Sequence, residues 1–212
     1  LMTRMREAGR SVSFDPNLRP SLWASSQQMI TEINRLAALA HWVLPGLSEG
    51  RLLTGFEDPA DIAAFYLDQG AEAVAIKLGP HGAYYRTHHD QGFVAGVPVQ
   101  TVVDTVGAGD GFAVGMISAL LENYSFADAV KRANWIGSRA VQSRGDMEGL
   151  PTRSEMSVEF EAAFAGKSDR RTAAPTGSCG EPKIHAHHAI SLGAAVRRSD
   201  LPAMRPAQSQ KI

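Results

Sequence analysis

A glycine turn that carries one carboxylate is the strongest chemical signal in the sequence. Residues 104–112 read DTVGAGDGF, and they lie between an apolar run and the apolar segment 112–121. Glycines such as Gly107 and Gly109 let the backbone come close to a ligand, and the free N–H groups of a first helical turn bind anions such as phosphate. Asp110 in the same turn can accept a proton from an attacking hydroxyl. The pattern predicts an anion site with a general base beside it.

Two well-known glycine motifs do not fit the spacing of this turn. A P-loop would end in Gly-Lys-Ser or Gly-Lys-Thr, a tripeptide that the sequence lacks. The dinucleotide-binding fingerprint would need Gly or Ala where Phe112 stands. A strand-to-helix turn that needs glycine only for its geometry remains an alternative to the anion site.

Two further turns follow predicted strands, and α/β folds place ligand residues at such points. Residues 13–23 read SFDPNLRPSLW, in which Arg19 offers a planar fork for a carboxylate or phosphate and Asn17 both a donor and an acceptor. Residues 77–82 read KLGPHG, a turn rich in backbone N–H groups in which Lys77 can face a phosphate. Each pattern also fits a turn that binds no ligand.

The composition of the chain limits the classes of protein to which these residues can belong. Its 212 residues suit one domain, or one domain with an appendage, and 44% hydrophobic with 20% charged residues is ordinary for a globular protein. A net charge of -1 provides no basic field for nucleic acid or an anionic membrane. The lone Cys179, the lack of a signal peptide and the lack of an apolar run of about 20 residues predict a cytoplasmic protein.

Alternating strands and helices must position the three turns. Strands interleaved with helices indicate an α/β layered fold with a largely parallel central sheet. Residues 153–212 are expected to be a tail that holds one helix and is otherwise disordered, because it buries too little apolar surface to offset its ordering entropy. Apolar runs predict strands at 11–14, 41–44, 73–78, 83–87, 92–98 and 101–103, and helical spacing predicts helices at 3–9, 25–40, 48–54, 58–69, 108–121, 126–142 and 154–164.

The segment 104–112 resembles the D-T-x-G-A-G-D-x-F signature of the PfkB (ribokinase-like) carbohydrate kinases at every defined position. The resemblance extends over residues 1–152 and implies the C-terminal, nucleotide-binding and catalytic part of that ribokinase-like fold, without its N-terminal strands and its lid. It implies that Asp110 is the base that activates a sugar hydroxyl. It also implies that the backbone of Gly107, Ala108 and Gly109 forms the anion hole for the transferring phosphoryl group.

Further positions take roles by the same resemblance. Asn17 and Arg19 lie in a stretch similar to the D-P-N-x-R-x-x-L-W of 2-keto-3-deoxygluconate kinases and fructokinases, where the substrate meets the phosphate. Glu49 matches the family's N-x-x-E motif, whose Glu organises Mg²⁺ through water, although Gly46 replaces the Asn. The nucleotide contacts implied are Asn17, Lys77, Gly79, Gly82, Gly107, Gly109 and Asn134. The oxygen ligands implied for a monovalent cation such as K⁺ are at Asp104, Val106, Ala140, Ser143, Gly145 and Gly149.

The resemblance implies an enzyme that uses ATP and Mg²⁺, and K⁺ in addition, to phosphorylate a sugar hydroxyl. We expect 2-keto-3-deoxygluconate as the acceptor, because Arg19 can pair with its carboxylate, and fructose as the alternative. The alternative to an enzyme is a pseudokinase or truncated product that binds nucleotide without turnover. The expected partners are the sugar or sugar acid and ATP, with no nucleic acid or membrane, and family members often form homo-oligomers through the lid that is missing here.

Overall fold

The structure, a computed structural model, describes residues 1–145 and 147–164. The part of the predicted tail (residues 153–212) that begins at residue 165, with Cys179, lies outside the described residues. No helix in the described ranges is long and apolar enough to cross a membrane. The α-helices are α1 (Met2–Glu7), α2 (Ser26–Ala37), α3 (Leu47–Thr54), α4 (Pro59–Asp68), α5 (Ala108–Leu121), α6 (Phe126–Ala140), α7 (Arg153–Glu155) and α8 (Glu161–Phe164). The strands are β1 (Ser13–Phe14), β2 (Trp42–Val43), β3 (Ala73–Lys77), β4 (Gly82–Thr87) and β5 (Gln91–Ala95).

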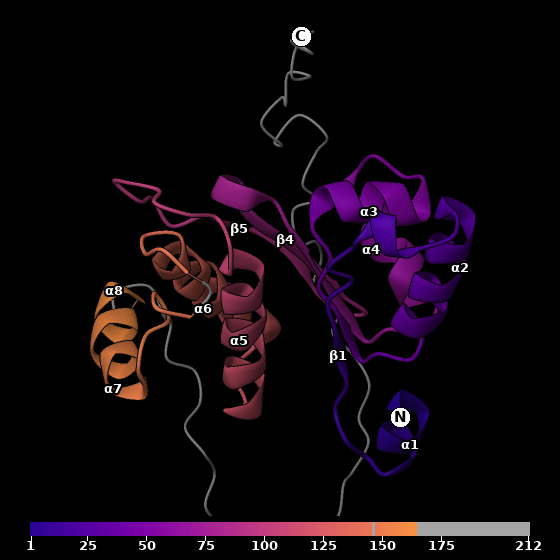
Figure 1. Cartoon of the computed structure of the whole chain (residues 1–212). Helices are drawn as coiled ribbons and strands as arrows, with labels where there is room; N and C mark the ends of the chain where they lie inside the picture. Colours follow the sequence, from indigo (N-terminus) through magenta and orange to yellow (C-terminus); the bar gives the residue numbers. More distant parts are fainter. Residues whose placement is uncertain (146, 165–212) are drawn as a thin grey trace, which may run out of the picture. The chain divides into compact units, whose positions relative to one another are not determined.

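The strands form one sheet in the order β1-β2-β3-β4-β5 (Figure 1). The pairs β1–β2 and β2–β3 are parallel, whereas β4 is antiparallel to both β3 and β5. Strand β5 therefore runs in the same direction as β1, β2 and β3, and only β4 is reversed. This topology confirms the predicted α/β fold with a largely parallel sheet.

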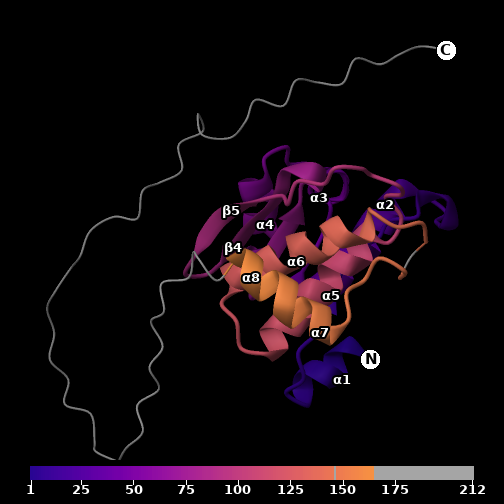
Figure 2. The same ribbon diagram turned by 90° about the vertical axis from the view of Figure 1, so that its left-hand side faces the viewer.

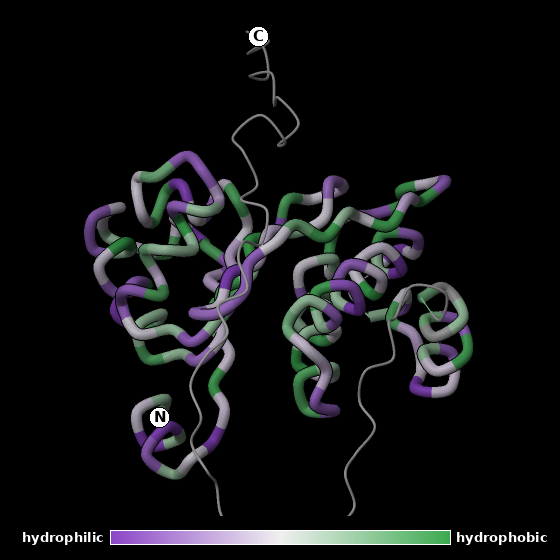
Figure 3. Tube along the Cα trace, turned by 180° about the vertical axis from the view of Figure 1, so that it is seen from behind, coloured by the Kyte–Doolittle hydropathy of each residue, from purple (hydrophilic) through white to green (hydrophobic). Residues whose placement is uncertain are grey.

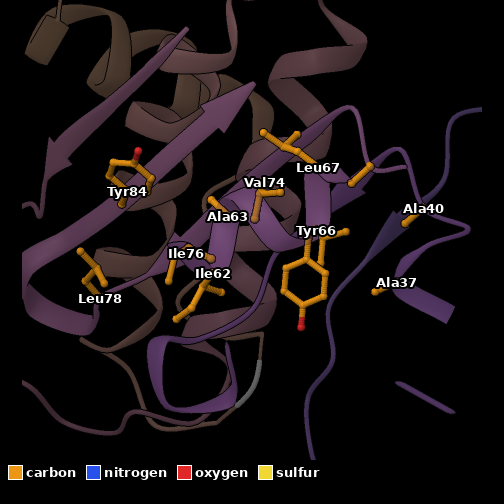
Figure 4. Packing of buried hydrophobic residues seen from close by; sticks show 12 residues of the cluster. Ala37, Ala40, Ile62, Ala63, Tyr66, Leu67, Val74, Ile76, Leu78 and Tyr84 are labelled. Atoms are coloured by element: carbon orange, nitrogen blue, oxygen red, sulfur yellow. The ribbon is translucent and has the colours of Figure 1, made fainter. Parts of the chain in front are cut away.

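Helices cover both faces of the sheet because side chains alternate along the strands. On β3, Val74 and Ile76 pack with residues of α4 such as Ile62 and Tyr66, as Figure 4 shows. The side chain between them, Ala75, packs with α5 and α6 on the other face. Figures 1 and 2 show α2, α3 and α4 on one side of the sheet and α5 and α6 on the other. Hydrophobic and hydrophilic residues alternate along the helices in Figure 3, as expected when one side of each helix is buried.

The strand predicted at residues 101–103 is wrong. These residues have no regular structure, and Val102 and Val103 are 56% and 51% exposed. The N–H groups of Val103 and Asp104 bond instead to the carbonyl of Val141, just after α6. The β-branched residues that suggested a strand thus lie in a connection held to a helix end, because tertiary contacts override local propensity.

The helix predicted at 154–164 is present, as α7, a π-helical turn η3 (Met156–Phe160) and α8. It packs on α6 through Phe160, whose ring lies 5.8 Å from that of Trp135. Residues beyond 153 therefore extend the hydrophobic core of the described structure.

Helices α5 and α6 approach each other closely at Gly115. A Cβ atom at this position would lie 2.5 Å from Cα of Ala133 on α6, which is closer than two non-bonded carbon atoms can come. Only glycine allows this approach. The packing fixes the axis of α5 and therefore the direction in which its first turn points.

The variant Gly115→Ala should lower the free energy of unfolding by about 1–3 kcal/mol, because the added methyl group forces α5 and α6 apart. Urea unfolding at 25 °C measures this change. The control is Val114→Ala, at a position 47% exposed on the same helix, which should change stability by less than about 0.5 kcal/mol. Equal stability of Gly115→Ala and the unmutated chain would contradict the packing described.

Candidate active site

A pocket of about 970 Å³ lies where the carboxyl ends of β2, β3 and β5 meet the first turn of α5. Parallel strands place their following loops at one edge of the sheet, so ligand sites of α/β folds lie there. Five of the predicted nucleotide contacts line it, and so do two of the three predicted anion-hole residues, Ala108 and Gly109. The five nucleotide contacts are Lys77, Gly79, Gly82, Gly109 and Asn134.

The first turn of α5 brings together the glycines and the carboxylate from which the sequence predicted an anion site. Gly107 precedes the helix with φ 78° and ψ -10°, a left-handed conformation that glycine adopts without strain. The N–H groups of Gly109 and Asp110 belong to the first turn, where no earlier helical carbonyl can accept them. Asp110 is exposed in the same turn. Gly107 therefore allows the left-handed backbone of the turn. The turn also places the N–H group of Gly109 at the pocket.

Lys77 connects this turn with the loop after β1. A Cβ atom on Gly109 would lie 3.4 Å from Nζ of Lys77, so the ammonium borders the first turn of α5. The same ammonium donates to Oδ2 of Asp15 at 2.5 Å, and the two side chains are 17% and 19% exposed. Burial raises the pKa of the Asp15 carboxyl, and Lys77 opposes that rise. The pair joins residues that are 62 positions apart in the chain.

Asn17 and Arg19, the residues predicted to bind the sugar, lie on the loop that follows β1 and do not line the pocket. Asn17 has φ 41°, a left-handed conformation that Asn tolerates better than most residues. Nη1 of Arg19 donates to Oδ1 of Asn17 at 2.7 Å and to the carbonyl of Leu18 at 2.9 Å. Both side chains are exposed. One edge of the guanidinium is thus fixed by its own loop, and Arg19 is held by Asn17.

Glu49 holds two backbone segments together. Its Oε2 accepts the N–H of Gly46 at 2.8 Å, which caps the N-terminus of α3. Its Oε1 accepts the N–H of Leu18 at 2.8 Å, on the loop after β1. Each carboxylate oxygen keeps one lone pair. A remaining lone pair on each oxygen is enough to accept a hydrogen bond from a water molecule bound to a metal ion.

Asn134 and Gly82 have structural partners on β5 as well as positions on the pocket wall. The amide of Asn134, on α6, is buried and donates to the carbonyls of Val94 and Ala95 at 3.0 and 3.2 Å. A side chain on Gly82 would collide with the carbonyl oxygen of Val94. Both residues are therefore explained by the attachment of β5, and their contact with a nucleotide stays a prediction.

The residues predicted for a monovalent cation lie around the C-terminal end of α6. The N–H of Asp104 donates to the carbonyl of Val141. The Oδ1 atom of Asp104 accepts the N–H of Val106 at 3.0 Å. Gly149 packs so tightly on Ala140 that a Cβ atom there would lie 2.9 Å from Cα of Ala140. A second cavity of about 260 Å³ is lined by Ser143 and Gly149, and Gly145 has φ 107°. In residues 1–145 and 147–164, no three His, Cys, Asp or Glu side chains cluster as metal ligands.

Sequence reasoning did not select Ser138 or Gly137, although both line the pocket on α6. Ser138 lies four residues after Asn134, so the two share one side of the helix. Extending the helical spacing from Asn134 would have found Ser138. Without that spacing, the sequence does not distinguish a helical serine that lines a pocket from one that faces solvent.

Comparison with known proteins links this chain to one family. Residues 1–153 match the model described as "pfkB family carbohydrate kinase". A 2-dehydro-3-deoxygluconokinase of Bacillus subtilis (strain 168) is 55% identical over 162 residues, covering 76% of this chain and 50% of that protein.

Solved structures agree with that match. A PfkB protein from Polaromonas sp. JS666 has a TM-score of 0.66 and 55% identity, over 74% of this chain and 49% of that one. A fructokinase double mutant from Vibrio cholerae O395, in its fructose, ADP and potassium ion bound form, has a TM-score of 0.68 and 32% identity, over 74% and 52%. The chain thus spans about half the length of the curated relatives it matches.

The variant Glu49→Ala should lower the free energy of unfolding by about 1–3 kcal/mol, because it leaves the N–H groups of Gly46 and Leu18 without their acceptor. Urea unfolding in Mg²⁺-free buffer measures the change. Glu32→Ala removes an exposed carboxylate paired with Arg35 and serves as the control, with an expected change under about 0.5 kcal/mol. If Glu49→Ala is as stable as the control, the structural role of this carboxylate is refuted.

Proposed function

The chain belongs to the pfkB family of carbohydrate kinases, and from that premise we propose that it transfers the γ-phosphoryl group of ATP to a hydroxyl of a sugar acid. One observation carries the proposal: the first turn of α5 holds free N–H groups and Asp110, and Ala108 and Gly109 of the same turn line a pocket of about 970 Å³. The acceptor that we propose is 2-dehydro-3-deoxygluconate. The 55% identity to a Bacillus kinase named for that sugar acid supports this choice.

The proposed transfer needs few chemical groups from the protein, since phosphoryl transfer depends mainly on positioning and charge stabilisation. The sugar hydroxyl oxygen forms a bond to the γ-phosphorus while the bond from that phosphorus to the β,γ-bridging oxygen breaks, which releases ADP. Asp110 accepts the hydroxyl proton. The N–H groups at Gly107, Ala108 and Gly109 stabilise the charge on the equatorial phosphoryl oxygens.

The rest of the pocket has the chemistry that a nucleotide requires. Its walls include apolar side chains beyond β5, such as Val97 and Val99, which can pack on a base. Asn134 and Ser138 on α6 add polar groups to the same wall. Mg²⁺ would be bound by the phosphates and would neutralise their charge, and Glu49 would bond to its water shell. We assign Gly79 and Gly82 to the loop that borders the nucleotide.

A monovalent cation, K⁺, is part of the proposal. The segment from Asp104 to Val106 is bonded to the end of α6, and it directly precedes the first turn of α5. Carbonyl and carboxylate oxygens there would bind K⁺ and rigidify the turn. The potassium-bound fructokinase with a TM-score of 0.68 supports a cation in this family. The oxygen donors would come from Asp104, Val106, Ala140, Ser143, Gly145 and Gly149.

Fructose is the second candidate acceptor. The fructokinase from Vibrio cholerae, 32% identical to this chain, favours it. Arg19 distinguishes the two acceptors, because a guanidinium pairs strongly with the carboxylate of a sugar acid and has no charged partner on fructose. A protein that binds nucleotide without turnover is the non-enzymatic alternative, and the presence of Asp110 disfavours it.

The variant Asp110→Asn should lower phosphoryl transfer by ~10²-fold or more and leave ATP affinity nearly unchanged, because only proton acceptance is lost. Release of ADP from ATP and 2-dehydro-3-deoxygluconate measures the rate, and calorimetry measures ATP binding. Asp68→Asn, at an exposed position that ends α4, is the matched control. Near-normal turnover by Asp110→Asn would remove this residue from the role of base. No turnover of either sugar by an unmutated chain that binds ATP would favour the non-enzymatic alternative.

The variant Arg19→Ala should raise KM for the sugar acid by roughly 10-fold or more and leave KM for ATP unchanged, since the charge-assisted hydrogen bond from the guanidinium to the sugar carboxylate is lost. Arg35→Ala, an exposed arginine of α2, is the control. Equal losses for both substrates would make Arg19 a structural residue. A preference of the unmutated chain for fructose would overturn the sugar-acid assignment.

A further inference from the structure

The ion pair between Lys77 and Asp15 joins two loops that the proposed reaction uses for different substrates. Lys77 ends β3, immediately before the turn that lines the nucleotide pocket. Asp15 follows β1 and begins the loop that carries Asn17 and Arg19. We propose that Lys77 binds a phosphate of the nucleotide and that Asp15 is a positioning residue that holds the lysine there. The inference rests on the proposed kinase function.

Geometry places the ammonium where a phosphate would arrive. Nζ of Lys77 borders the first turn of α5, at 3.4 Å from the Cβ position of Gly109. The N–H groups of that turn and the ammonium therefore face the same small volume at the edge of the pocket. An ammonium has three N–H donors, and Asp15 accepts one of them. Two donors remain for oxygens of a bound anion.

The side chain of Lys77 is mostly buried, so its ammonium is held in place more firmly than that of a surface lysine. Its side chain is 17% exposed, whereas exposed lysines are mobile and bind anions weakly. Asp15 is the carboxylate that pairs with it, and Glu49 adds a second negative charge nearby. The second oxygen of Asp15, Oδ1, is buried and has no hydrogen-bond partner in the described structure. The ion pair is thus the main compensation for burying Asp15, so each member fixes the position of the other.

A purely structural role of the ion pair and a phosphate-binding role of Lys77 predict different changes in the affinities for ATP and adenosine. A structural pair stabilises the fold but does not distinguish ligands. A positioned ammonium contributes to the affinity for ligands with phosphates and contributes nothing to the affinity for adenosine. The ratio of ATP affinity to adenosine affinity therefore separates the two roles.

The experiment measures dissociation constants of ATP and adenosine by calorimetry for the 212-residue chain and four variants. The variants are Lys77→Met, Asp15→Asn, the double variant with both changes, and Lys131→Met. Lys131 is the matched control, because it also pairs with an aspartate, Asp128 at 2.6 Å, but does not line the pocket. Thermal melting of each variant checks that it folds.

We expect Lys77→Met to weaken ATP binding by roughly 10- to 100-fold and to change adenosine binding by less than about 2-fold. Asp15→Asn should weaken ATP binding by roughly 3- to 10-fold, because the lysine loses its fixed direction. In the double variant the Asp15 change should add no further loss, since Asp15 acts only through Lys77. Lys131→Met should resemble the unmutated chain.

Several outcomes would overturn the inference. Equal ATP-to-adenosine ratios for Lys77→Met and Lys131→Met would make the ion pair structural only, while the kinase function would stand. Tighter ATP binding by Asp15→Asn would show that Asp15 competes with phosphate and does not position the lysine. Absence of ATP binding by the unmutated chain would overturn the proposed function, and this inference with it. If Lys77→Met fails to fold, the double variant, which buries no unpaired charge, gives the same comparison of ATP with adenosine.

Discussion

The close packing of α5 on α6 is the constraint on which the candidate site depends. Gly115 lets the two helices touch, and this contact sets the axis of α5. The axis fixes where the unpaired N–H groups of the first turn point, because those groups lie along it. The left-handed Gly107 turns the chain into the helix at the edge of the pocket. The phosphate site that we propose there would depend on helix packing as much as on the residues of the turn.

Side chains, not continuous strands, connect the loops that surround this turn. Strands β1 and β2 have two residues each, so their short ladders alone constrain the following loops weakly. Glu49 bonds the loop after β1 to the start of α3, and the pair of Lys77 with Asp15 bonds the same loop to the end of β3. Charged groups thus set the distance between the loop that carries Asn17 and Arg19 and the pocket of about 970 Å³. The same charges would take part in substrate binding.

The sequence predicted the architecture well, since periodic apolar residues and strong turns determine it. The helix that starts at Ala108 and the buried strand from Ala73 are examples. It failed at residues 101–103, because a β-branched run does not reveal whether a neighbouring strand exists. The sequence also did not predict contacts between residues that are far apart in the chain. No local pattern joins Lys77 to Asp15, and the capping role of Glu49 was hidden because Gly46, not serine or threonine, precedes α3.

The central claim is that the first turn of α5 binds the phosphates of a nucleotide, and amide chemical shifts of the ¹⁵N-labelled chain test it most directly. Titration with a non-hydrolysable ATP analogue should shift the amide signals of Gly107, Ala108, Gly109 and Asp110 more than other signals. Titration with adenosine should leave these four signals nearly unchanged, because adenosine lacks phosphates. Analogue-induced shifts that spare this turn and concentrate elsewhere in the chain would contradict the account.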